Sequence, residues 1–156
     1  MEQQSSSNLS IVAELNQLIE INKYRTEEYK LAISATRDPA LKSVFERYCK
    51  QSVQFTKTLS TWLMSYGQKL SDAVHRPTGY DKVVAKLKSF LPRPGREEIL
   101  QACEYREAVA MGIYKKILSL HRLPYEAFLE VRRQKEHIEK AFREMITLSD
   151  PAALTY

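Results

Sequence analysis

Four long amphipathic stretches, separated by connections of very unequal length, restrict what this chain can fold into. Apolar residues recur at helical spacing over about residues 8–36, 38–66, 96–120 and 125–148. Only a few residues join the first stretch to the second and the third to the fourth, so each pair must pack as an antiparallel hairpin. Residues 68–94 break the pattern, and that segment is long enough to return the chain along the length of a bundle.

Local signals indicate where these helices begin and end. Asp38-Pro39 supplies an N-cap followed by proline at the first helical position. Gly67 is the residue type that commonly follows a helix C-terminus. Ser7 or Asn8 is expected to cap the first helix.

The long connection between the hairpins distinguishes between bundle topologies. It holds a short candidate helix, DKVVAKLKSF, flanked by HRPTG and LPRPG. Two hairpins joined by one long crossover is the connectivity of ferritin-like bundles, whereas an up-down-up-down bundle has short loops throughout. We therefore predict an all-α, ferritin-like four-helix bundle, with two antiparallel helical hairpins joined by a long crossover containing a short helix. Residues 1–156 are expected to form one domain, with flexible tails at 1–8 and 149–156.

The composition is that of a soluble globular protein. Of the 156 residues, 44% are hydrophobic and 28% are charged, and the formal net charge is +5. The start MEQQSSSN lacks the features of a signal peptide, and no run approaches the roughly 18 apolar residues of a membrane span. Cys49 and Cys103 form no C-x-x-C pair. We expect a protein of the reducing cytoplasm without a membrane partner, and the basic residues lack the interleaved aromatics that favour nucleic acid.

Several sequence segments resemble those of one bacterial family. They are LNQLIEINKYRTEEY in the first helix, LKSVFERYCKQSVQF in the second, HR in the crossover and EEILQACEYREAVAMGIYKKIL in the third. This family is a four-helix-bundle domain of unknown function within the ferritin-like superfamily, and the resemblance covers about residues 12–146. It implies a ferritin-like fold and a bacterial, cytoplasmic origin. It implies little about activity, because a shared fold does not transfer the di-iron or di-manganese centre of other ferritin-like proteins.

Most of the residues that a di-metal centre needs are missing from this sequence. Such a centre takes a Glu from each of two helices and a Glu-x-x-His pair from each of the other two. No glutamate of this chain has a histidine three positions later. Where the resemblance places these pairs, the second helix has Gln54 and Lys57 and the fourth has Gln134 and His137. His137 is therefore interpreted as the remnant of a site, on the flank of the bundle.

Polar residues nevertheless interrupt the predicted core at one level. Asn22 and Ser52 lie at similar distances from the first short turn, and Glu107 and Gln134 from the second, so these residues meet near mid-bundle. We predict a buried polar layer there, made of Asn22, Thr26, Ser52, Glu104, Glu107 and Gln134.

Buried carboxylates at Glu104 and Glu107 are costly unless they are compensated. Compensation can come from a metal, from a cation such as Lys135, or from protonation of one carboxyl. The simplest alternative is a closed hydrogen-bond network with tyrosines, Asn22, Gln134 or water. No cofactor or metal is expected, but if iron or manganese binds, the candidate ligands are Glu104, Glu107, Glu27 and His137.

The leading functional hypothesis is a non-enzymatic, ferritin-like bundle that serves as a structural, interaction or stress-associated module with a degenerate metal site. No nucleophile-elbow, phosphate-loop or zinc-protease motif occurs in the chain. The rival hypothesis is an iron- or manganese-binding protein that uses the mid-bundle carboxylates. Bundles of this kind often pair along their helices, so a homodimer is compatible with the pattern, and the sequence specifies no other protein partner.

Overall fold

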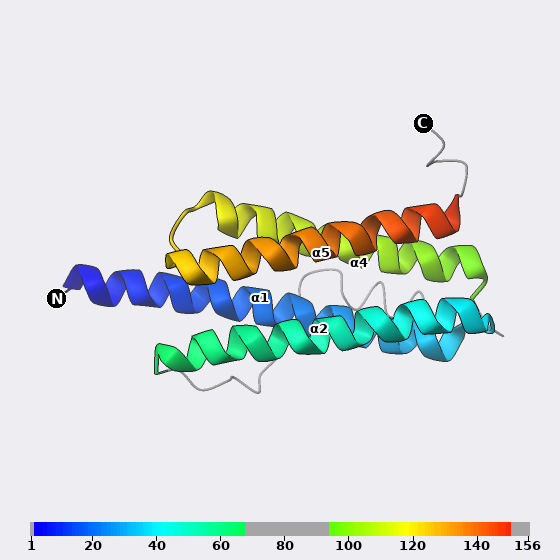
Figure 1. The fold of residues 1–156 in the computed structure, drawn as a ribbon, viewed down its shortest axis with the longest axis horizontal. Helices are drawn as coiled ribbons and strands as arrows, with labels where there is room; N and C mark the ends of the chain where they lie inside the picture. The colour runs from blue at the N-terminus through cyan, green and yellow to red at the C-terminus, as the bar shows by residue number, and fades with distance from the viewer. Residues whose placement is uncertain (1, 68–93, 151–156) are drawn as a thin grey trace.

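The computed structural model describes residues 2–67 and 94–150, and this part of the chain is all-helical (Figure 1). The fold therefore confirms the prediction of four helices, with no strand among the described residues. The helices are α1 (Glu2–Ala35), α2 (Pro39–Ser65), α4 (Arg96–Ser119) and α5 (Tyr125–Ser149).

The helices form two antiparallel hairpins laid side by side (Figure 1). α1 runs away from the N-terminal end of the bundle and α2 returns, whereas α4 begins at the far end and runs parallel to α2 before α5 turns back. α1 packs against both α2 and α4, α4 packs against α5, and α2 and α5 lie farther apart and meet through long side chains such as Arg47 and Glu144. The chain must therefore travel the length of the bundle between α2 and α4. The predicted short helix DKVVAKLKSF and His75 lie outside the described residues.

The helix ends show which local signals determine the structure. Asp38 is the N-cap of α2, and its Oδ1 accepts a hydrogen bond from the Ala40 N–H at 2.9 Å. Gly67 follows α2 with φ of +74°, a left-handed conformation that glycine adopts without strain. The predicted start of α1 is wrong, because the helix begins at Glu2 and passes through Ser7 and Asn8. Serine and asparagine favour a cap but do not impose one, so the helix passes through them.

The core divides into two apolar clusters stacked along the bundle axis. One lies toward the N-terminal end of α1 and is built around Leu15, Leu59 and Tyr114, with many further apolar neighbours. The other lies around Phe45 and Leu100 near the turn between α1 and α2. Between the two clusters, all four helices carry buried polar side chains, so the polar layer sits at mid-bundle.

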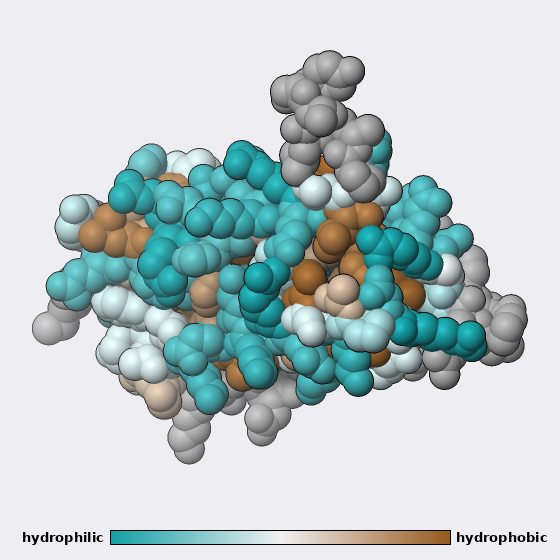
Figure 2. Space-filling model, turned by 45° about the vertical axis from the view of Figure 1, so that its right-hand side comes forward, coloured by the Kyte–Doolittle hydropathy of each residue, from teal (hydrophilic) through white to brown (hydrophobic). Residues whose placement is uncertain are grey.

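The face of the molecule shown in Figure 2 is mainly polar, with teal side chains covering most of it and brown hydrophobic patches between them. Four large apolar side chains are exposed at the end of the bundle where α1 begins and α2 ends: Leu9 is 65% exposed, Met64 58%, Leu120 40% and Tyr125 75%. No described helix is both long enough and apolar enough to cross a membrane.

Candidate functional site

An arginine and a glutamate form a fully buried ion pair at the centre of the polar layer. The Nε of Arg25 in α1 lies 2.9 and 3.0 Å from the two carboxylate oxygens of Glu107 in α4. Both side chains are 0% exposed. The Tyr29 hydroxyl donates a further hydrogen bond to Glu107 Oε1 at 2.6 Å. Such a pair is stable inside a protein only when the other donors and acceptors of both groups are also satisfied.

The remaining nitrogens of Arg25 meet this requirement. Nη1 donates to Asn22 Oδ1 and Nη2 donates to Gln51 Oε1, each at 2.9 Å. The guanidinium also lies 5.7 Å from the centre of the Phe55 ring, within the range of a cation–π contact. Burial by itself would lower the pKa of Arg25, but the Glu107 carboxylate outweighs it and the pKa is raised. The guanidinium is therefore a permanent buried cation.

A hydrogen-bonded chain extends from this pair to the other hairpin. The Asn22 amide donates to the Tyr114 hydroxyl at 2.7 Å, and this hydroxyl donates to Gln134 Oε1 at the same distance. The Gln134 amide donates in turn to Glu130 at 3.2 Å. Burial raises the pKa of Tyr114 far above neutrality, so its hydroxyl keeps the proton that it donates. One polar network thereby links α1, α4 and α5, and Arg25 ties it to α2.

A second, smaller contact joins α1 to α2 at the same level. The hydroxyls of Thr26 and Ser52 lie 2.6 Å apart. Thr26 also bonds the backbone oxygen of Asn22, and Ser52 bonds that of Cys49. These hydroxyl groups are therefore engaged within the interface.

Two further buried carboxylates lie along α1. Glu28 is 1% exposed and Glu14 is 5% exposed, and within the described residues neither carboxylate has a hydrogen-bond partner. Burial raises the pKa of Glu28 to about 7, although the Arg106 charge opposes the shift. Burial likewise raises the pKa of Glu14, against the opposing charge of Arg122, whose Nη1 lies 3.7 Å from its carboxylate.

The structure places the residues of the predicted polar layer as follows. Asn22, Ser52, Glu107 and Gln134 are completely enclosed, and Thr26 is 8% exposed. Glu104 is only half-buried, because a separation of three residues turns it away from Glu107 toward the edge of the helix face. The cation at Glu107 is Arg25, whereas Lys135, the cation considered from the sequence, lies 3.5 Å from Glu139 in its own helix.

The other candidate metal ligands point in different directions. Glu27 is exposed and pairs with Lys30 at 3.8 Å on the outer surface of α1. His137 is half-buried where α5 faces α2, with its ring edge-on to Phe55 at 6.2 Å between ring centres. Burial, followed by the charges of Arg133 and Lys140, lowers the pKa of His137. The described residues contain no group of three or more His, Cys, Asp or Glu side chains arranged to hold a metal ion.

Sequence reasoning missed the central cation, Arg25, although it considered tyrosines as partners of the buried glutamates. Arg25 lies at a core position, since Leu18, Arg25 and Tyr29 share one helix face. An apolar pattern predicts which apolar residues are buried, and it does not identify an arginine on the same face. The signal that could have found it is the position of Arg25 on the core face of the first helix, since a glutamate buried in the third helix needs a cation or a donor on a facing helix.

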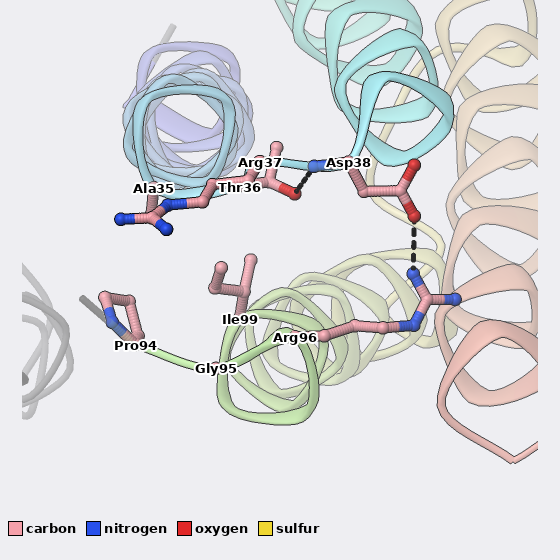
Figure 3. Close-up of a pocket in the computed structure, with 8 residues that line it drawn as sticks. All are labelled: Ala35, Thr36, Arg37, Asp38, Pro94, Gly95, Arg96 and Ile99. Carbon is pink, nitrogen blue, oxygen red and sulfur yellow. Dashed lines mark hydrogen bonds and ion pairs between the residues drawn. The ribbon is translucent and has the colours of Figure 1, made fainter.

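The pocket of Figure 3 lies at the end of the bundle, where the turn between α1 and α2 meets the start of α4. It has a volume of about 400 Å³, and Ile99 forms part of its wall. Arg96 is held at its edge by Asp38 at 3.1 Å and by the Leu148 carbonyl at 3.2 Å. The Glu98 carboxylate already lies over the N-terminus of α4, since a Cβ added at Gly95 would come within 2.5 Å of it. The end of the helix is thus covered by an acid of its own chain.

Comparisons with known proteins place the chain in a family without supplying a function. The family model described as a domain of unknown function (DUF2383) matches residues 10–120, which is most of the chain. Neither the curated proteins nor the solved structures gave a significant match.

Proposed function

The chain belongs to the family of the domain of unknown function DUF2383, and we propose that it is a non-enzymatic structural or interaction protein with a ferritin-like bundle. In this proposal the buried Arg25–Glu107 pair takes the place of the metal centre that such bundles hold between their helices. The pair is the observation that carries the proposal.

The order of the helices supports the ferritin-like assignment. α1 and α2 form one antiparallel hairpin, α4 and α5 form the other, and α2 runs parallel to α4 (Figure 1). A bundle with this order needs one long connection, and ferritin-like bundles have one.

The chemistry of the central layer does not fit a di-metal centre. A metal pair needs several carboxylates with free lone pairs facing one another. Here the Glu107 oxygens accept hydrogen bonds from Arg25 and Tyr29, and Arg25 brings a positive charge to the level at which a metal would sit. A divalent cation would have to displace the guanidinium from a carboxylate that it contacts at 2.9 Å. We therefore derive no metal chemistry from these residues.

A layer of this kind suits a rigid scaffold. Its donors and acceptors are matched to one another across the four helices, and the match holds for one arrangement of the helices. We further propose that the protein is bacterial, cytoplasmic and stress-associated. This part of the proposal rests on the resemblance of its helix sequences to those of the bacterial family.

Metal analysis tests the proposal directly. The protein is expressed in medium supplemented with iron and manganese, purified without chelators, and analysed for metal per chain alongside Glu107→Gln. We expect far less than one metal per chain in both proteins, and no acceleration of Fe(II) oxidation in air. One or two metals per chain in the wild type, lost in Glu107→Gln, would establish the metal-binding alternative instead.

The exposed apolar end supplies a surface for interaction, and the proposal is that two copies of the chain pair there. Leu9, Met64 and Tyr125 lie at that end, and apolar side chains exposed at one end of a bundle are candidates for an interface. Sedimentation velocity should show a dimer that Met64→Lys converts to monomer. The control is Val53→Lys, which changes a side chain that is 39% exposed in the middle of α2 and should leave the dimer intact. A monomer in the wild type, or a dimer unaffected by Met64→Lys, would contradict this part of the proposal.

A further inference from the structure

Glu28 is a buried acid that the central network does not use. It lies on α1, is 1% exposed, and neither of its oxygens accepts a hydrogen bond from the described residues. The Arg25–Glu107 pair, by contrast, has hydrogen bonds on each of its charged atoms. Glu28 is therefore a carboxyl group for which the charged form is poorly supported.

The described groups that face Glu28 belong mainly to α4. Arg106 is the charged residue that acts on it, and Cys103 lies close enough for the Glu28 charge to raise the pKa of its thiol. On its own helix, the ring of Tyr24 lies 5.7 Å from the Arg106 guanidinium. α2 packs against the opposite side of α1, where Thr26 and Ser52 meet, and no described charged group of α2 is among those that act on Glu28.

Charging Glu28 changes the balance at this interface. A neutral carboxyl buried without hydrogen bonds costs less than a carboxylate in the same place, because the carboxylate also loses the solvation of its charge. The Arg106 charge offsets part of this cost, but no hydrogen bond between the two side chains completes the pairing. The carboxylate can regain solvation only if water enters between the helices or if the side chains rearrange.

We propose that Glu28 is a pH-responsive contact between the two hairpins, which packs tightly against α4 when its enclosed carboxyl is neutral and loosens the α1–α4 interface when the carboxyl is charged. The response is built into the fold and is independent of whether the protein binds a metal. It concerns the stability and dynamics of the bundle across neutral pH.

The direction of the effect follows from linkage. The pKa of Glu28 is raised by burial from 4.5 to about 7 in the folded protein. Its favourable contribution is therefore complete below pH 4.5 and is lost as the pH rises through 7. Glu14, whose pKa is also raised, acts in the same direction, whereas His137, whose pKa is lowered, acts in the opposite one. Only a comparison with a Glu28 variant isolates its share.

Thermal unfolding of the wild type, Glu28→Gln and Glu27→Gln between pH 5 and 8 tests the inference. Glutamine keeps the shape of the side chain and stays neutral, and the neighbouring Glu27 is exposed. Relative to Glu28→Gln, the Tm of the wild type should fall by an amount on the order of 5 °C over this range. Glu27→Gln should follow the wild type. Parallel profiles for the wild type and Glu28→Gln would overturn the proposal.

Two measurements on the folded protein complete the test. In a carbon-13 NMR titration, the Glu28 carboxyl should titrate with a midpoint near 7, and a midpoint near 4.5 would refute the inference whatever the variants do. Hydrogen exchange, corrected for its intrinsic pH dependence, should show weaker protection of residues 24–32 and 99–110 at pH 8 than at pH 6. This loss should be absent in Glu28→Gln, and equal losses in both proteins would show that Glu28 does not control the interface.

Discussion

Replacing Glu107 with leucine removes the only carboxylate that contacts Arg25 in the described structure. The variant leaves a guanidinium that is 0% exposed without its counter-ion, and it leaves the Tyr29 hydroxyl without its acceptor. Leucine also fills the space of the glutamate side chain, so the effect measures loss of pairing more than loss of volume.

The magnitude follows from the burial of both partners. Breaking a buried pair by removing one partner costs about 3–5 kcal/mol, because the remaining charge is uncompensated. A domain of this size is stable by roughly 5–15 kcal/mol, so Glu107→Leu should lose a large share of its stability and can be largely unfolded at 37 °C. A glutamate that belonged only to a neutral network would give a neutral or stabilising change instead.

Urea unfolding followed by circular dichroism at pH 7 measures the difference, with two companion variants. Arg25→Leu/Glu107→Leu removes both charges, and it should recover most of the stability lost in Glu107→Leu, because a buried pair replaced by apolar residues is often neutral or better. Glu104→Leu, one turn away and half-buried, should change stability by less than about 1 kcal/mol.

The double-mutant comparison also decides between explanations. If Glu107→Leu lies within about 1 kcal/mol of the wild type, the guanidinium is not held by the carboxylate as the structure has it, and the account of the central layer fails. If the double variant is no better than the single one, the loss comes from packing of the glutamate stem and not from the unpaired charge.

Three further predictions concern single groups. Tyr114→Phe should cost about 1–3 kcal/mol in urea unfolding, because Asn22 and Gln134 each lose a buried hydrogen-bond partner. Asp38→Ala should lower stability by about 1 kcal/mol in the same assay through loss of the α2 cap, and Asp38→Asn, which keeps a capping oxygen, should lose less. Cys103, whose thiol is enclosed and whose pKa is raised by burial, should resist iodoacetamide at pH 8 in the native protein and react fully in urea, as followed by mass spectrometry; rapid native labelling would contradict its burial.

The sequence predicted the hairpins well because their signals are local. Asp38-Pro39 caps α2 as expected, since an N-cap side chain and a fixed proline φ act within a few residues. The position of the polar layer along the bundle could also be predicted, because antiparallel helices joined by a short turn bring residues at equal distance from that turn to the same height. The start of α1 could not be predicted in this way, because serine occurs both at the N-cap and in the interior of helices.

Arg25 illustrates why the charge of the layer could not be read from a helical wheel. A wheel orders residues around one helix, whereas the burial of an arginine depends on what the neighbouring helix offers to it. Glu107 on α4, Gln51 on α2 and Asn22 one turn away are all needed before the guanidinium can leave water. These partners come from three helices, so no single amphipathic pattern contains the information.

The same dependence gives the central layer a structural consequence. Sliding α4 by one turn against α1 would move Glu107 about 5.4 Å along the axis, well beyond reach of a hydrogen bond from Arg25. Apolar residues on either side of the layer would tolerate such a shift better, because hydrophobic contact is non-directional. Tyr114 would lose Asn22 at the same time, so an error in register breaks the network on both sides of the ion pair. The Arg25–Glu107 pair thus selects one alignment of the two hairpins.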